Sequence, residues 1–261
     1  MDLRSTLHAQ LSTLHPSMAG HSRWAKVKTF KGAIDAKRGR IFSKLAREIA
    51  MVVKQGGGDK DMNPRLRMAL LKGRMASMPA ENIERAIKKG LGTDGGTAFE
   101  DLTYEIYAPH GVALLVELQT DNRNRTAAEI RSIVTKGGGS IATPGSVTRL
   151  FHRRGQLVVP REGANEDQVM EVALEAGAAD FQADEHGYEI LTDPAHFEAV
   201  HAALEGKGFK CAVAEVAPLP TLTVPLTEEA RAADVQKMID ALEEHDDVKE
   251  LHSNAAFPEA H

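Results

Sequence analysis

The chain has 261 residues, and its 32 Lys and Arg against 37 Asp and Glu give a formal net charge of −5. This length predicts two or three domains, and the 42% hydrophobic content is enough for buried cores. The single cysteine, Cys211, excludes an intramolecular disulfide framework and a cysteine-based zinc site. The sequence has neither the roughly 18 consecutive apolar residues of a membrane span nor the pattern of a secretory signal, so we expect a cytoplasmic protein without membrane contact.

Charge is sorted along the sequence. Residues 18–92 carry 18 Lys and Arg against 6 Asp and Glu, a local charge of +12. Residues 156–261 carry 6 against 23, a local charge of −17. This asymmetry predicts a surface that binds nucleic acid in the first region. We expect the acidic half to be repelled by nucleic acid or to contact a basic protein partner.

Residues 33–90 have helical periodicity. Apolar residues between Asp35 and Lys54 repeat at helical spacing, and Gly56–Gly58 would end that helix. Asn63 as N-cap and Pro64 predict the start of a second helix, and Pro79 predicts a third. We therefore expect a basic helical domain of three helices over residues 18–96, preceded by a disordered extension, residues 1–17.

After residue 100 the pattern changes to short strands and helices. Strands are predicted at 104–107 and 112–119, followed by a helix over 126–136. Residues 149–218 have the β-α-β-β-α-β pattern of a ferredoxin-like unit, with helix starts at Asn165 and at Asp193-Pro194. Cys211 lies in an apolar strand pattern and is expected to be in the core.

The last elements need a sheet to join. They are a strand at 221–224, a helix at 227–244 and a strand at 247–253. Because the strands at 104–119 also lack partners, we predict an α+β fold in which the three-helix domain is followed by two α/β sandwich domains. The acidic ferredoxin-like domain, 149–218, would be inserted into a discontinuous domain formed by 97–148 and 219–261.

The first helix carries the sharpest functional signal. Lys37, Arg40, Lys44, Arg47 and Lys54 lie on one side of it, opposite the apolar residues. These five cations, called the basic stripe below, can follow a phosphate backbone while the buried face holds the helix in place. The alternative is a solvated helix face, although this helix has only two acids to pair with its cations. We predict phosphate contacts.

Other residues extend this predicted nucleic-acid interface. Trp24 lies among cations before the first helix, where it either stacks on an unpaired base or anchors the N-terminal arm. Arg123 and Arg125 either belong to a helix-capping segment, with Asn124 or a nearby group as the cap, or fork onto phosphates or a partner's carboxylates. The remaining members are Arg23, Lys26, Lys28, Arg38, Arg65, Arg67, Lys72, Arg74, Arg85, Lys88 and Lys89.

We find no spacing typical of a catalytic or metal site. The 11 histidines show no paired metal-binding spacing, and no nucleophile with a matching base is evident. We expect no catalytic residues, no metal, no cofactor and no small-molecule substrate. A remote alternative is a metal-dependent nuclease that gathers Mg²⁺ with carboxylates, although acids that flank strands are far more often surface residues. The candidates are Asp101, Glu105, Glu117, Asp121 and Glu129.

Several segments in order closely resemble the YebC/PmpR family. They are MAGHSRWAKVK from Met18, DAKRGRIFSKLAREI from Asp35, NPRLR from Asn63, MPAENIERAIKKG from Met78, YEIYAPHGVA from Tyr104 and TDNRNRT from Thr120. Residues 1–17 lie outside the resemblance, which leaves Met1 and Met18 as alternative translation starts.

The resemblance implies a cytoplasmic, non-enzymatic, three-domain α+β protein. Family members are usually described as DNA-binding transcriptional regulators. Others, including the mitochondrial translational activator of cytochrome oxidase, are associated with translation and the ribosome. We therefore expect a DNA-binding transcriptional regulator. The alternative is a ribosome-associated translation factor that binds RNA through the same basic helices, and no recognition helix of helix-turn-helix type is evident to decide between them.

Overall fold

The computed structural model describes residues 34–92 and 99–258, with side chains from residue 39 onward. The fold is mixed α+β, as predicted. The described residues divide into two compact units, of which the smaller includes residues 153–217 and the larger includes residues 34–92, 99–152 and 218–258. Among the described residues, no helix is long and apolar enough to cross a membrane.

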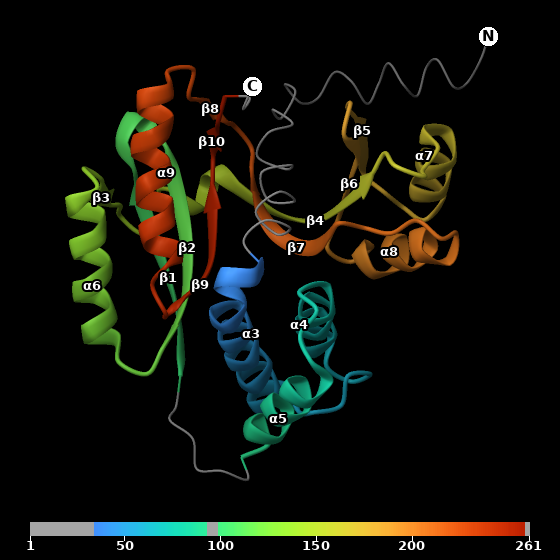
Figure 1. Ribbon diagram of the computed structural model, residues 1–261, viewed down its shortest axis with the longest axis horizontal. Helices are drawn as coiled ribbons and strands as arrows, with labels where there is room; N and C mark the ends of the chain where they lie inside the picture. Colours follow the sequence, from blue (N-terminus) through green and yellow to red (C-terminus); the bar gives the residue numbers. More distant parts are fainter. Residues whose placement is uncertain (1–33, 93–98, 259–261) are drawn as a thin grey trace. The chain divides into compact units, whose positions relative to one another are not determined.

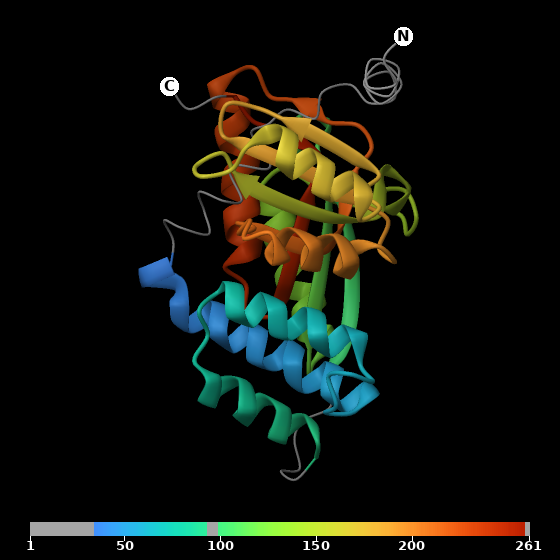
Figure 2. The same cartoon turned by 90° about the vertical axis from the view of Figure 1, so that its right-hand side faces the viewer.

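Three helices begin the larger unit. They are α3 (Ile34–Gly56), α4 (Pro64–Met75) and α5 (Ala80–Gly90). α3 lies between the other two and contacts both (Figure 2). Their shared core contains Ile49, Leu66 and Ala86. Each of these residues is almost completely buried, so the helices are held together by aliphatic packing.

Local sequence signals explain where these helices start and how closely they pack. The predicted start of α4 is confirmed, because Asn63 accepts a hydrogen bond from the backbone N–H of Leu66 at 3.1 Å and Pro64 is the first helical residue. Gly90 allows α5 to approach α3. A Cβ at this position would lie 2.4 Å from the carbonyl oxygen of Ala50, so any larger residue would push the two helices apart.

A four-stranded antiparallel sheet forms the rest of the larger unit. Its order is β3-β1-β2-β9, and β9 pairs with β2 from the other end of the sequence. One face is covered by two helices, α6 and α9 (Figure 1). The strands and helices are β1 (Glu100–Tyr107), β2 (Ala113–Thr120), β3 (Ser140–Ile141), β9 (Val248–Ser253), α6 (Arg123–Lys136) and α9 (Glu229–Glu243).

Both faces of the central strand β2 are buried. Leu114, Val116 and Leu118 pack against α6 and α9. On the opposite face, Leu115 packs against Val147 and Phe151. Short elements complete this unit: the 3₁₀ turns η1 (Pro109–Gly111) and η2 (Thr148–Leu150), and the parallel pair of β8 (Val224–Pro225) and β10 (Ala255–Ala256).

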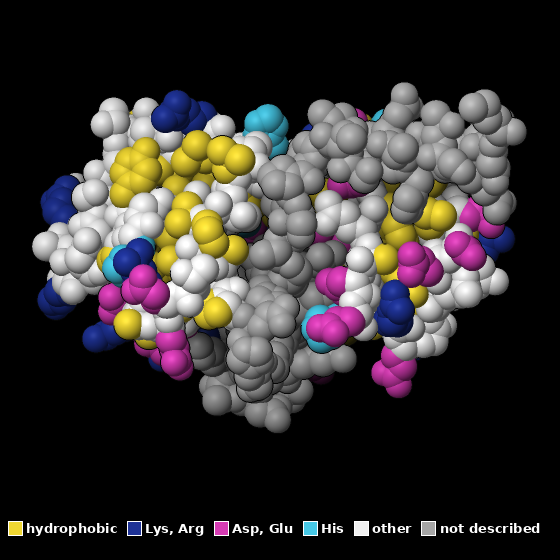
Figure 3. All heavy atoms as spheres, turned by 90° about the horizontal axis from the view of Figure 1, so that it is seen from above, with side chains coloured by type: hydrophobic (Ala, Val, Ile, Leu, Met, Phe, Trp, Pro, Cys, Tyr) yellow, Lys and Arg dark blue, Asp and Glu magenta, His cyan; other side chains and the backbone are white. Residues whose placement is uncertain are grey.

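The smaller unit has ferredoxin-like topology. Its strand order is β5-β6-β4-β7, with one helix after β4 and one after β6. Residues 153–217 carry 5 Lys and Arg against 13 Asp and Glu, and Figure 3 shows acidic side chains on the surface of this unit. The elements are β4 (Phe151–Pro160), α7 (Glu166–Glu175), β5 (Asp180–Ala183), β6 (Gly187–Thr192), α8 (Phe197–Gly206) and β7 (Val213–Pro220).

Three sequence predictions about local structure are wrong. The strand expected at 221–224 is only the short β8, because β7 continues to Pro220 and Thr221 donates its N–H to the carbonyl oxygen of Leu150 at 2.9 Å. α8 begins at Phe197, since residues 194–196 form a turn. Cys211, which was expected in a core strand, is only half-buried and lies in the segment before β7. Burial raises the pKa of its thiol to about 12.

Candidate nucleic-acid interface

Part of the predicted interface lies outside the described residues. Arg23, Trp24, Lys26 and Lys28 precede residue 34. The backbone of Lys37 and Arg38 is helical, but their side chains are not among those described. The geometry below therefore concerns the cations from Arg40 onward.

The basic stripe of α3 has exposed residues near its ends and residues in its middle that contact other parts of the chain. Arg40 and Lys54, near its two ends, are exposed. Lys44, in the middle, donates from Nζ to the backbone oxygen of Glu243 at 2.7 Å, at the end of α9. Burial lowers the pKa of Lys44, and the nearby charges of Glu243 and Asp246 oppose that shift. The middle of the stripe therefore faces acidic residues of the same chain.

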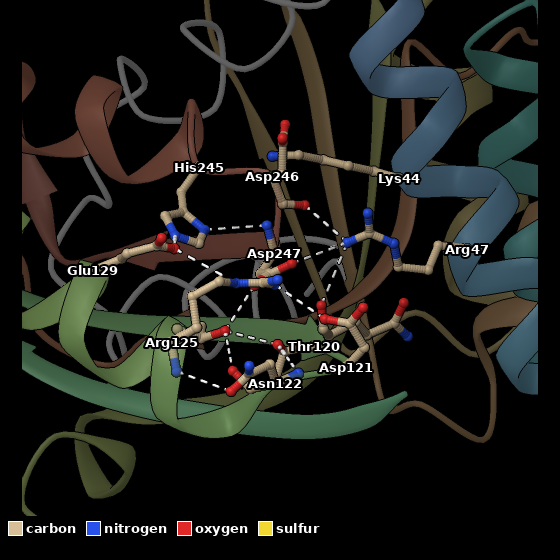
Figure 4. A network of polar contacts seen from close by, with 12 residues as sticks. Lys44, Arg47, Thr120, Asp121, Asn122, Arg125, Glu129, His245, Asp246 and Asp247 are labelled. Atoms are coloured by element: carbon tan, nitrogen blue, oxygen red, sulfur yellow. Dashed lines mark hydrogen bonds and ion pairs between the residues drawn. The ribbon is translucent and has the colours of Figure 1, made fainter. Parts of the chain in front are cut away.

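Among the stripe residues whose side chains are described, Arg47 makes the most extensive contacts (Figure 4). Its Nη1 lies 3.0 Å from the backbone oxygen of Asp246 and 3.4 Å from that of Gln119. The same nitrogen is 3.5 Å from Oδ1 of Asp247, and the guanidinium carbon lies 5.2 Å from the ring centre of Phe99. The Arg47 side chain is only 25% exposed. It ties α3 to the turn before β9.

Asp247 is the centre of this network. Its Oδ2 accepts hydrogen bonds from Oγ1 of Thr126 at 2.7 Å and from Nη2 of Arg125 at 2.8 Å. Burial would raise the pKa of Asp247, but the bonds from Thr126 and Arg125 outweigh it and hold the pKa below its ordinary value. The carboxylate is ionised and bridges two arginines, Arg47 from α3 and Arg125 from α6.

The segment before α6 provides the helix cap that its sequence suggested. Asn122 is the N-cap of α6, where it accepts from the backbone N–H of Arg125 at 3.1 Å, and Asn124 lies inside the helix. The same Nη2 of Arg125 reaches Oδ1 of Asp121 at 3.1 Å and Oδ2 of Asp247 at 2.8 Å, so Arg125 pairs with carboxylates of its own chain. Its contact with phosphates or with a partner's carboxylates stays a prediction. Arg123 is exposed.

A second group of ion pairs joins α4 to the sheet. Lys72 pairs with Glu250 of β9, and it lies 3.5 Å from Oε1 of Glu48 on α3. Lys249 also reaches Glu48, at 3.2 Å. Although burial would raise the pKa of Glu250, the charges of Lys72 and Lys249 lower it to about 2. Lys72 is therefore held within the chain, like Lys44 and Arg47.

The other described cations of the three helices face solvent to a greater extent. Arg65 donates to Oε1 of Gln55 at 2.6 Å and remains exposed, whereas Arg67 is half-buried and donates to the backbone oxygens of Lys60 and Asp61. The exposed members of the predicted interface on α3, α4 and α5 are Arg40, Lys54, Arg65, Arg74, Arg85, Lys88 and Lys89.

The cleft beside Arg47 does not favour a phosphate in this arrangement. Three arginines line it together with five carboxylates, so acids outnumber permanent cations. His245 also lines it and lies 2.9 Å from Glu129. The acidic lining residues are Asp121, Glu129, Glu244, Asp246 and Asp247, and the arginines are Arg40, Arg47 and Arg125. Sequence reasoning missed the acids after α9, although the −17 charge of the second half pointed to them.

The carboxylates considered for Mg²⁺ have separate roles. Glu105 accepts backbone N–H bonds from the loop before β4, including Gly145 at 2.6 Å, and these bonds lower its pKa despite its burial. Glu117 pairs with Lys249 at 3.8 Å, and Asp121 pairs with Arg125. Among the residues that the structure describes, no group of three or more His, Cys, Asp or Glu is arranged to hold a metal ion.

Comparison with known proteins agrees with this architecture. Residues 22–93 match the family model of the TACO1/YebC protein N-terminal domain, and residues 99–255 match that of the TACO1/YebC second and third domain. A probable transcriptional regulatory protein of Leptospira biflexa is 48% identical over 237 residues, which cover 91% of this chain and 96% of the relative. One from Treponema denticola is 49% identical over 242 residues, covering 93% and 98%.

A solved structure gives the same result. The crystal structure of a conserved hypothetical protein from Aquifex aeolicus is 44% identical and superposes with a TM-score of 0.77, covering 87% of this chain and 93% of that one. Identity at this level over nearly the whole length, together with two family models that cover most of the chain, identifies the family. The chain belongs to the TACO1/YebC family.

Proposed function

We propose that this protein is a transcriptional regulator that binds DNA through the phosphate backbone, using the helical domain of residues 18–96. The observation that carries the proposal is the set of exposed cations on α3, α4 and α5, in a region of net charge +12. Phosphate contacts from Lys and Arg supply most of the affinity of such an interface and make it depend steeply on salt. The names of the relatives, probable transcriptional regulatory protein, support the regulatory role.

The acidic regions would restrict nucleic acid to the helical domain, because they repel it elsewhere. Residues 153–217, with 13 acids against 5 cations, would be repelled by a polyanion. In this proposal the discontinuous domain, 97–148 with 219–261, and the inserted domain, 149–218, do not contact DNA. The protein works in the cytoplasm by binding, without catalysis, metal or cofactor.

A translation factor that binds ribosomal RNA is the second candidate. The exposed cations favour it equally, because phosphate contacts position a protein without reading sequence and both nucleic acids present phosphates. Fractionation of a lysate on a sucrose gradient, with and without ribonuclease, separates the two. Ribosomal co-migration that survives moderate salt and is lost with ribonuclease would support translation, whereas enrichment on promoter DNA would support transcription.

The test of the interface uses the full chain and a short DNA duplex of mixed sequence. Replacing Arg74, Arg85 and Lys89 with Gln removes up to three phosphate contacts, so the slope of log K against log salt should weaken by up to about 2.7. The matched control replaces three exposed cations of α6 and α9, outside the predicted interface, with Gln: Arg131, Lys136 and Lys237. Equal losses in both triple variants would refute the assignment of the interface to α3, α4 and α5.

A further inference from the structure

We propose that the acidic segment, Glu243–Glu250, occupies part of the nucleic-acid-binding surface, so that DNA phosphates and this segment compete for the same cations. The inference rests on the proposed function and adds its regulation. The segment contains five carboxylates and one lysine, and it connects α9 to β9. It contacts three cations that the sequence assigned to the nucleic-acid interface, namely Lys44, Arg47 and Lys72.

The contacts resemble those that a phosphate backbone would make. Lys44 and Arg47 each donate to a backbone oxygen of the segment, at 2.7 and 3.0 Å. Arg47 also lies within ion-pair distance of the Asp247 carboxylate, and Lys72 pairs with that of Glu250. Cations on two helices, α3 and α4, thus contact oxygens at several positions along the acidic segment. Phosphate oxygens are equally good acceptors for these donors.

Two acids of the segment, Asp247 and Glu250, would keep partners if the three cations left. Asp247 retains Arg125 at 2.8 Å and Thr126 at 2.7 Å. Glu250 retains the charge of Lys249 and has His252 at 3.6 Å. Losing one partner is costly when it leaves a buried charge unpaired. Because these two carboxylates keep other partners, release of the helices leaves neither of them unpaired. The exchange of carboxylate for phosphate is therefore feasible without unfolding the sheet.

The partial exposure of Arg47 and Lys72 also supports displacement of the segment by DNA. The side chains of Arg47 and Lys72 are 25% and 19% exposed, so water and salt reach both pairs. Salt therefore screens these pairs in part, although the carboxylates of Asp247 and Glu250 are themselves largely buried. A duplex with many closely spaced charges can replace them. The acidic segment would lower the affinity for nucleic acid and would favour ligands with enough phosphates to displace it.

The first experiment weakens the acidic segment. In the full chain, Asp246→Asn combined with Glu250→Gln removes carboxylates that act on Lys44 and Lys72. We expect tighter binding of a short duplex, with a salt slope steeper by up to about 1.8 for two released cations. The matched control, Glu228→Gln with Glu229→Gln, changes the net charge equally at the exposed start of α9. Equal affinities and slopes in the two double variants would overturn the proposal.

A second measurement needs no variant. Hydrogen exchange of the wild-type chain, followed by mass spectrometry, reports on the backbone amides of residues 243–250 with and without saturating duplex. We expect faster exchange in this segment when DNA binds, because the duplex replaces its contacts with α3 in part of the bound molecules. Unchanged exchange with DNA bound would show that the segment stays in place, and would refute competition.

The two hypotheses fail in different ways. If neither the wild type nor the double variants bind duplex DNA or ribosomal RNA, the proposed function is wrong. If all of them bind with the same affinity and salt slope, the interface is correct and only the competition is wrong. Binding by the Asp246/Glu250 variant alone would support both.

Discussion

Replacing the whole basic stripe provides a quantitative test of the contacts seen in the structure. Lys37, Arg40, Lys44, Arg47 and Lys54 are changed together to Gln in the full chain. If all five contacted a duplex, the salt slope would weaken by up to about 4.5. The structure, however, holds Lys44 and Arg47 against the acidic segment. In bound molecules that retain those contacts, only three cations reach phosphates. The slope should therefore weaken by less than about 4.5, with about 2.7 as the value when all molecules retain them.

The assay is fluorescence anisotropy of a labelled duplex over a series of KCl concentrations, with circular dichroism to show that the variant is folded. A second quintuple variant in the background of Asp246→Asn and Glu250→Gln measures the stripe after the acidic segment is weakened. There the loss should approach about 4.5, relative to the same background with an intact stripe. An unchanged slope in the first variant would remove α3 from the interface. Equal slope losses in both backgrounds would refute the division of the stripe.

Four further outcomes follow from the structure. Asn63→Ala should lower the free energy of unfolding in urea by about 2 kcal/mol, because it removes the N-cap of α4 and the hydrogen bond from Nδ2 to the backbone oxygen of Gly57. An unchanged free energy of unfolding would contradict the capping role. Gly90→Ala should cost about 1–3 kcal/mol by forcing α5 from α3, and an unchanged unfolding midpoint would show that the helices can separate freely. The pKa of Glu250 is lowered from its ordinary value of 4.5 to about 2 in the folded chain. The ionised carboxylate therefore stabilises the fold above pH 4.5, and this contribution is lost as the pH falls toward 2. Glu250→Gln should lack this part of the pH dependence of the urea midpoint. The protein should not cleave duplex, single-stranded or branched DNA with Mg²⁺ or Mn²⁺, and cleavage that disappears in Asp121→Ala would establish the nuclease alternative.

Much of the fold could be predicted because its signals are local. Asn63 and Pro64 start α4, and Asn165 caps α7 by accepting from the N–H of Gln168. The glycines after Lys136 end α6, with Gly138 at φ +77°, a conformation that side chains with a Cβ rarely adopt. Each of these effects acts within a few residues, so a sequence pattern is sufficient to recognise it. The order of elements in 149–218 then indicated the ferredoxin-like topology.

One of the errors has its physical origin in a contact between distant residues. The segment 221–224 has the composition of a strand, but a strand needs a partner to pair with, and Thr221 bonds to Leu150 instead. Cys211 follows an apolar pattern, yet it lies before the first residue of β7. For residues 221–224, local preference was a weak guide because a bond to a distant residue decided the outcome.

The sequence by itself determined the helix periodicity, the caps and the separation of charge between the two halves, because these depend on spacing and composition. It also placed Arg40, Lys44, Arg47 and Lys54 on one side of a helix. Only the tertiary structure decided that the middle two of these face Glu243–Asp247 while the outer two are exposed. Helical spacing determines which side chains share a face. What that face contacts depends on β9 pairing with β2, which brings the acidic segment from the far end of the chain against α3.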